Sequence, residues 1–175
     1  SAAPPDGAAR RMRILQGFPP VAAPDSRVLI LGSMPGEASL RAGQYYAHPR
    51  NAFWPIMAEM CGAGPSLAYP QRLAALRAAR IALWDSLQAC IRPGSLDSAI
   101  RDEVANDFAG FLAAHPGVTH VFFNGAKAEA AFRRHALPLL PGCRQVLTRL
   151  PSTSPAHASL DFAAKLAAWR GIMAV

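Results

Sequence analysis

The run VLILG at residues 28–32 ends in glycine and is apolar throughout, which is typical of a strand buried on both faces of a parallel sheet. Three similar runs follow, separated by segments with helical periodicity: RIALWD at 80–85, VTHVFFNG at 118–125 and RQVLTRL at 144–150. Strands that alternate with helices predict a parallel sheet with helices on both faces. We therefore expect an α/β fold built on a mainly parallel four-stranded sheet.

The helices are expected from the spacing of apolar side chains between these strands. After a loop over residues 33–50, apolar residues from Phe53 to Met60 recur at helical spacing, so a helix begins near 51–54. Another is expected over 71–79, and residues 86–102 are expected to be a long connection with a turn at Pro93 and Gly94. Val104, Phe108, Phe111 and Leu112 predict the next helix, and the last two are expected over 126–136 and about 159–170.

Length and composition indicate one globular domain. The chain has 175 residues, of which 51% are hydrophobic and 17% are charged, and this balance excludes a mainly disordered protein. No apolar run approaches the roughly 20 residues that span a bilayer, so no membrane association is expected. We expect a flexible basic arm over residues 1–24 and a single domain over 25–175. The oligomeric state is not set by the sequence, and a monomer is the working expectation.

Charge and cysteine usage bear on the partner and the compartment. With 18 Lys and Arg against 11 Asp and Glu, the net charge is +7, which suits a polyanion such as nucleic acid. An arginine-rich composition inherited from a GC-rich genome explains the same charge equally well. The three cysteines are far apart and form no CxxC pair, which excludes a usual zinc or iron–sulfur spacing and favours a reducing, cytoplasmic location.

Polar segments follow all four expected strands. They are GSMPG through HPRN after the first, WDSL after the second, NGAK after the third and PSTSPAH after the fourth. In open parallel sheets, ligands bind beyond the carboxyl ends of the strands. The four loops are therefore expected to form one site.

Within the HPRN segment, each polar residue has a functional and a structural interpretation. Asn51 precedes a helix, so it would either cap that helix or hold a water or a base by hydrogen bonding. His48 would contact a phosphate or complete a turn, and Arg50 would bind a phosphate or lie solvated on the surface. Tyr46, in the same loop, offers a ring on which a base can stack.

The other loops leave similar alternatives. Asp85 ends an apolar strand, where a carboxylate is costly unless it is paired or used, so it either accepts from an N–H of a base or pairs with an arginine such as Arg92. Asn124 would read a polar edge or cap the helix that begins at Ala126. The hydroxyls and prolines of PSTSPAH suit a DNA backbone or groove, or a plain turn. The residues of this loop assigned to DNA are Ser152, Ser154, Pro155 and His157.

Taken together, these segments resemble the uracil-DNA glycosylase superfamily. VLILGSMPGEASLRAGQYYAHPRNAFW, ALWDSLQACIRPGSLDSAI, FFNGAKAEAAF and LPSTSPAH carry the resemblance in that order, over about residues 27–170. Within the superfamily the chain is most similar to the hypoxanthine-DNA (DNA-deoxyinosine) glycosylases. The resemblance implies a three-layer α/β/α sandwich and cleavage of the N-glycosidic bond of a deaminated nucleotide in double- or single-stranded DNA. It implies no metal and no cofactor.

The resemblance also implies roles for individual residues. Mismatch-specific uracil enzymes carry a water-positioning asparagine where this chain has Met34, which cannot activate water, so the catalytic role moves to Asn51. Tyr46 is expected to stack on the extruded base, and Asp85 to face its edge. Ser33, Met34 and Asn124 are placed beside the base, and His48 and Arg50 at the DNA. The alternatives are a uracil-DNA glycosylase acting on G:U mismatches and a non-catalytic module that binds damaged DNA or nucleotides.

Overall fold

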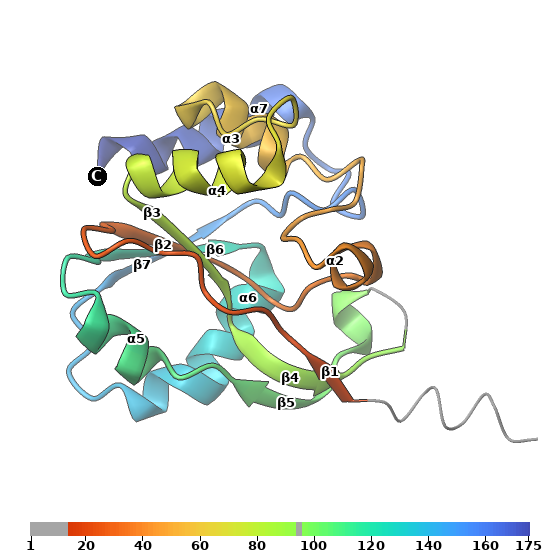
Figure 1. Ribbon diagram of the computed structural model, residues 1–175. Helices are drawn as coiled ribbons and strands as arrows, with labels where there is room; N and C mark the ends of the chain where they lie inside the picture. Colours follow the sequence, from red (N-terminus) through yellow and green to blue (C-terminus); the bar gives the residue numbers. More distant parts are fainter. Residues whose placement is uncertain (1–13, 94–95) are drawn as a thin grey trace, which may run out of the picture.

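The computed structural model describes residues 14–93 and 96–175 and contains a four-stranded parallel sheet between two helical layers (Figure 1). The strand order is β3-β2-β6-β7, and every neighbouring pair in this sheet is parallel. The strands are β2 (Val28–Gly32), β3 (Ile81–Asp85), β6 (His120–Asn124) and β7 (Val146–Leu150). The predicted α/β/α sandwich around a short parallel sheet is therefore confirmed.

The alternation of side chains along β2 divides the hydrophobic core into two halves. Ile30 points to the face covered by α3 (Phe53–Cys61), α4 (Tyr69–Ala78) and α7 (Phe162–Trp169), where it belongs to one cluster with Phe53 and Trp169. Leu29 and Leu31 point to the opposite face. Because β2 is central and buried on both sides, its residues are apolar at every position.

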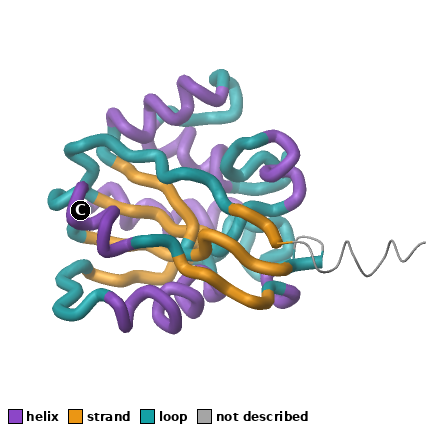
Figure 2. Tube along the Cα trace, turned by 60° about the horizontal axis from the view of Figure 1, so that its bottom comes forward, coloured by secondary structure: helices purple, strands orange, loops and turns teal. Residues whose placement is uncertain are grey.

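The opposite face is covered by α5 (Phe108–Ala114) and α6 (Ala126–Ala131). Phe108 and Phe132 pack there against the sheet residue Phe123. The chain after α6 continues through a π-helical turn (Phe132–Ala136) and a 3-10 turn (Leu137–Leu139), and α7 is followed by a 3-10 turn (Arg170–Ala174). Figure 2 shows the strands lying between the helices from another direction.

A second, antiparallel sheet was not expected. It has the order β1-β4-β5 and consists of β1 (Ile14–Gln16), β4 (Leu87–Ile91) and β5 (Arg101–Ala105). The prediction of a simple connection over 86–102 was therefore wrong, and so was the assignment of Val104 to a helix. Val104 is opposite Ala89 in the antiparallel pair, and the helix begins later because the Asp107 side chain accepts from the N–H of Gly110.

Residues 1–13 of the arm expected over 1–24 lie outside the described residues, and the assignment of residues 14–24 to an arm was wrong. From Ile14 onward the segment joins the domain. β1 pairs with β4, and Val21 exchanges two backbone hydrogen bonds of 2.8 Å with Leu83. The indole of Trp84 donates to the carbonyl of Phe18 at 3.0 Å. Apolar side chains such as Val21, which is 5% exposed, stabilise this docking by leaving water.

One further helix was not expected, and the last helix begins later than the sequence pattern indicates. The loop over 33–50 contains a short helix, α2 (Glu37–Ala42), which ends at Gly43 in the left-handed conformation. The last helix begins at Phe162 rather than near 159, because Asp161 caps it by accepting from the N–H of Ala164. A further 3-10 turn, η1 (Asp97–Ala99), precedes β5. Within the described residues, no helix combines the length and hydrophobicity required to cross a membrane.

Candidate functional site

A cavity of about 560 Å³ lies where the four parallel strands end. Gly32 ends β2, Asp85 ends β3 and Asn124 ends β6, and all three line it, together with the loop after β7. All but one of the residues singled out in the sequence line this cavity, namely Ser33, Met34, Tyr46, His48, Asn51, Asp85, Asn124, Ser152, Ser154, Pro155 and His157. Arg50 is the exception: it is exposed and does not line the cavity.

Asp85 is the most unusual charged group of the cavity. Its side chain is buried at 4% exposure, and among the described residues its Oδ2 atom has no hydrogen-bond partner. Burial, and then the charge of Asp97, raise the pKa of Asp85 from 3.8 to about 7, while the charge of Arg92 acts in the opposite direction. A buried oxygen without a donor is costly, so this arrangement favours a ligand that brings an N–H to Asp85.

Gly32 is required because Asp85 and Tyr46 converge on it. A Cβ atom at residue 32 would lie 2.5 Å from Oδ1 of Asp85 and 2.8 Å from the hydroxyl of Tyr46. No side chain fits there without displacing one of these groups. The glycine thus makes room for two protein side chains of the site, a different role from the close backbone approach to a ligand that a glycine turn suggests in sequence.

Tyr46 has a strained backbone and a buried hydroxyl. Its φ of 53° lies in the left-handed region, which a non-glycine residue adopts at a cost. The ring stacks on Phe53 with centroids 4.1 Å apart, so Phe53 already covers one of its faces. The hydroxyl oxygen is buried without a hydrogen-bond partner in the described part of the chain. Burial, and then the charge of Asp85, raise the pKa of this hydroxyl and outweigh the opposing effect of the neighbouring Asn124 amide, so the hydroxyl stays neutral and its O–H can donate.

Asn51 lies in the turn just before α3, whose N-cap is Ala52 and not Asn51. Its Oδ1 accepts from the N–H of Phe53 at 2.9 Å and so holds this turn. Its side chain also lines the cavity. With Oδ1 held by the backbone, the amide nitrogen is the part of Asn51 best placed to hold a water or a sugar oxygen.

Asn124 fixes the loop after β7 and does not cap α6, whose first flanking residue is Gly125. Its Nδ2 donates to the hydroxyl of Thr153, and its Oδ1 accepts from the N–H of Thr153, both at 2.9 Å. Thr153 also accepts, through its carbonyl, from the N–H of Ala52 at 3.0 Å. Thr153 is 1% exposed and so links the ends of β6 and β7 to the start of α3, where Asn51 lies.

The rim of the cavity carries the side chains assigned to DNA. His48 and Pro155 are exposed, and Ser154 and His157 are partly exposed. The N–H of Arg50 donates to Nδ1 of His48 at 3.1 Å, so Nδ1 is unprotonated and Nε2–H is available as a donor. The hydroxyls of Ser152 and Ser154 accept from backbone N–H groups of their own loop, which builds the turn and leaves each O–H to donate.

Sequence reasoning missed several residues of the cavity. Asp97 on η1 lines it and accepts from the hydroxyl of Ser33 at 2.6 Å, while Ser33 itself is 8% exposed. Thr153, described above, stood unremarked between two serines. Glu37 and Lys127 also line the cavity. No local sequence pattern indicates Asp97, because its contact with Ser33 joins distant parts of the chain and is visible only in the tertiary structure.

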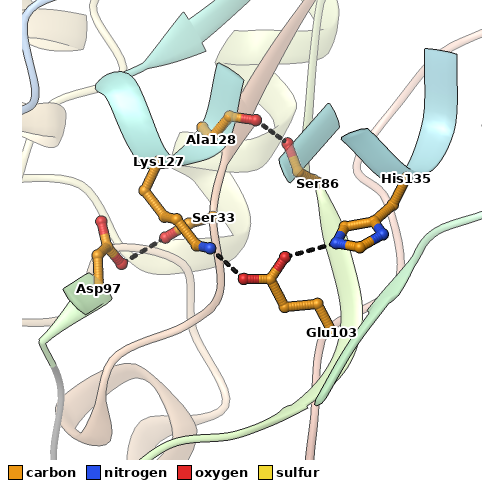
Figure 3. Close-up of polar contacts among 7 residues, drawn as sticks. All are labelled: Ser33, Ser86, Asp97, Glu103, Lys127, Ala128 and His135. Atoms are coloured by element: carbon orange, nitrogen blue, oxygen red, sulfur yellow. Dashed lines mark hydrogen bonds and ion pairs between the residues drawn. The ribbon is translucent and has the colours of Figure 1, made fainter. Parts of the chain in front are cut away.

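Lys127 is part of a polar cluster that joins α6 to β5 (Figure 3). Glu103 on β5 accepts from Nζ of Lys127 with one carboxylate oxygen and contacts Nε2 of His135 at 2.7 Å with the other. Burial alone would raise the pKa of Glu103, but the hydrogen bonds from Lys127 and His135 outweigh it and lower this pKa. Beside the cluster, the hydroxyl of Ser86 donates to the carbonyl of Ala128 at 2.7 Å. These contacts hold one wall of the cavity.

Comparison with known proteins identifies the family. Residues 19–172 match the model of the uracil DNA glycosylase superfamily. A protein of Methanosarcina barkeri named hypoxanthine DNA glycosylase is 43% identical over 114 residues, which is 65% of this chain and 72% of that protein. One of the same name from Methanosarcina acetivorans is 40% identical over 145 residues, or 82% of this chain and 89% of that protein.

A solved structure is similar over almost its whole length. The solution NMR structure of a candidate uracil DNA glycosylase from Methanosarcina acetivorans is 37% identical and has a TM-score of 0.75. The similarity covers 91% of this chain and 99% of that one. The chain belongs to the uracil DNA glycosylase superfamily.

Proposed function

We propose that this protein is a DNA repair glycosylase that removes hypoxanthine from DNA by hydrolysing the N-glycosidic bond and leaving an abasic site. The observation that carries the proposal is the cavity at the strand ends, where Oδ2 of the buried Asp85 has no hydrogen-bond donor among the described residues. The names of the two relatives from Methanosarcina support the choice of base. At about 560 Å³ the cavity has room for a purine.

Binding requires the damaged nucleotide to leave the helix. Extrusion of a base costs a few kcal/mol, and least where the base is mispaired, as hypoxanthine is opposite thymine. The exposed rim residues His48 and Pro155, with the nearby Arg50 and the serine hydroxyls of residues 151–157, would hold the flanking backbone. The net charge of +7 supports a polyanionic partner. The substrate is therefore DNA, in single- or double-stranded form.

Base recognition falls to the closed part of the cavity. In its ionised form, Asp85 accepts from N1–H of hypoxanthine, which gives its buried Oδ2 the donor it lacks in the free protein. Asn124 holds Thr153 and so sets the wall opposite the base. Met34, which is 7% exposed, contributes apolar surface and no chemistry.

Bond cleavage depends on positioning and electrostatics. The bond between C1′ and N9 breaks, the sugar gains oxocarbenium character and the bonding electron pair leaves with the base. A water adds to C1′ and gives up a proton, and the base takes up a proton to leave as hypoxanthine. The amide nitrogen of Asn51, fixed by the bond from Phe53 to Oδ1, holds the water or sugar in place. Since an amide is a poor base, slow turnover is expected.

The test is excision from matched oligonucleotides that carry inosine, uracil, xanthine or adenine at one position, followed by cleavage of the abasic site with alkali. Inosine excision that is lost in Asn51→Ala, with DNA binding retained, is the expected result. Preferential uracil excision would support the second candidate, a G:U mismatch uracil-DNA glycosylase, because Asp85 accepts equally well from N3–H of uracil. Binding of damaged DNA without excision of any base would leave a non-catalytic module.

A further inference from the structure

Two buried polar atoms of the cavity lack a hydrogen-bond partner within the described residues: Oδ2 of Asp85 and the hydroxyl of Tyr46. The two side chains meet at one place, because Oδ1 of Asp85 and the Tyr46 hydroxyl lie 2.5 Å and 2.8 Å from the point where a Cβ of Gly32 would stand. Orphaned buried groups are rare in folded proteins, and each costs about 1–3 kcal/mol. Because the Asp85 carboxylate and the Tyr46 hydroxyl converge on one glycine, one ligand can bring partners to both groups.

The chemistry of the two groups is complementary. Tyr46 carries a neutral hydroxyl that donates one hydrogen bond, and an ionised Asp85 only accepts. A ligand that satisfies both must present an acceptor and an N–H donor side by side. The lactam of a deaminated base has this order, as C6=O and N1–H in hypoxanthine or C4=O and N3–H in uracil.

We propose that the Tyr46 hydroxyl is a specificity-determining group that donates to the carbonyl of the flipped base while Asp85 accepts from the adjacent ring N–H. The proposal rests on the proposed function and gives Tyr46 a role beyond stacking. The stack on Phe53 then has a purpose of its own: it holds the ring so that the hydroxyl points beside Asp85. The left-handed φ of 53° at Tyr46 is part of the same positioning.

The pair also explains how undamaged adenine is rejected. Adenine has a lone pair on N1, where hypoxanthine has a hydrogen, and this lone pair would face the Asp85 carboxylate. The hydroxyl of Tyr46 can turn to accept from the 6-amino group, but while Asp85 is ionised no rotation relieves the contact at N1. A site with such unpaired groups rejects the wrong base strongly. The pair therefore reads the chemical change that deamination makes.

The test combines one variant with one altered base. Tyr46→Phe keeps the ring and its stack on Phe53 but removes the hydroxyl. In 6-thio-2′-deoxyinosine, sulfur replaces the carbonyl oxygen and accepts hydrogen bonds poorly, while N1–H remains. Single-turnover excision is measured for both proteins on both bases in the same duplex. We expect Tyr46→Phe to lose about 10- to 100-fold on inosine and less than about threefold on the thio base.

Tyr45→Phe is the matched control, because Tyr45 is the neighbouring buried tyrosine and its hydroxyl donates to the carbonyl of Pro19 at 2.8 Å. Its effect should be the same on both bases. Equal losses on both bases in Tyr46→Phe, or no loss on inosine, would overturn the proposal. If the wild type releases no base, the proposed function fails. The role of Tyr46 in base recognition is then tested by binding, as the affinity of each protein for DNA that carries 2′-fluorinated inosine. Weaker binding by Tyr46→Phe than by the wild type then supports it, and equal binding overturns it.

Discussion

Replacing Asp85 by asparagine should stabilise the folded protein at neutral and alkaline pH. Burial raises the pKa of Asp85 from its ordinary value of 3.8 to about 7. Between these two values the folded state keeps a proton that the unfolded state releases, so the free energy of unfolding of the wild type falls as the pH rises. The amide of Asp85→Asn carries no titrating proton and does not have this penalty.

The size of the effect follows from the two pKa values of Asp85. The penalty of the wild type is under about 1 kcal/mol at about pH 4 and grows to about 4 kcal/mol at about pH 8. Any packing effect of the substitution is the same at both pH values, so the comparison between them isolates the titration. The gain in stability should come with a loss of inosine excision, because the neutral amide oxygen of asparagine accepts more weakly from N1–H of the base than a carboxylate does.

Urea denaturation of the wild type and Asp85→Asn, at about pH 4 and about pH 8, measures this difference. Asp161→Asn is the surface control, because the exposed Asp161 caps α7 and asparagine is an equally good cap. An Asp85→Asn variant whose advantage over the wild type is the same at both pH values would refute the reasoning. Asp85 would then have a partner or a solvation that the structure does not show.

Three further perturbations test the surroundings of the site. Asp97→Asn removes a charge that raises the pKa of Asp85. The acid limb of the profile of kcat/KM against pH reports the ionisation of Asp85, so this limb should move to lower pH. A limb that does not move would show that the two carboxylates are uncoupled. Glu103→Gln should lower the free energy of unfolding by about 1–3 kcal/mol, as measured by urea denaturation. Since the pKa of Glu103 is lowered, the difference in free energy of unfolding between the wild type and Glu103→Gln should be present at neutral pH and shrink as the pH falls through that pKa. A difference that does not depend on pH would contradict the ion pairs of Glu103. Thr153→Val removes the hydroxyl that accepts from Asn124, so single-turnover excision should fall about tenfold with the fold retained, whereas an unchanged rate would exclude a positioning role.

Most of the parallel sheet was predictable because β2, β3 and β6 are almost wholly buried and therefore mainly apolar, as VLILG shows, whereas β7 is partly exposed. The antiparallel sheet was not. β4 mixes buried and exposed positions and β5 has no fully buried residue, so neither has the apolar run of a central strand. Val104, which is 52% exposed, lies at helical spacing from Phe108 by coincidence. Its partner Ala89 is fixed by tertiary pairing, which no local pattern reveals.

The candidate site was predictable to a similar degree. Loops that follow parallel strands share one edge, so Asp85, Asn124 and Asn51 could be assigned to one cavity from their places in the sequence. The contacts within the cavity could not. The whole fold sets the directions of these side chains. It buries the Tyr46 hydroxyl beside Asp85 and directs the Asn124 amide to Thr153.

Identification of the products formed from an inosine-containing duplex tests the central claim most directly. The purified protein is incubated with the duplex, and free base and intact strand are quantified by mass spectrometry before any alkali treatment. We expect free hypoxanthine in equal amount to abasic sites, with the strand uncut, and neither product from Asn51→Ala. Inosine that stays attached to its sugar in the presence of saturating wild-type protein would contradict it.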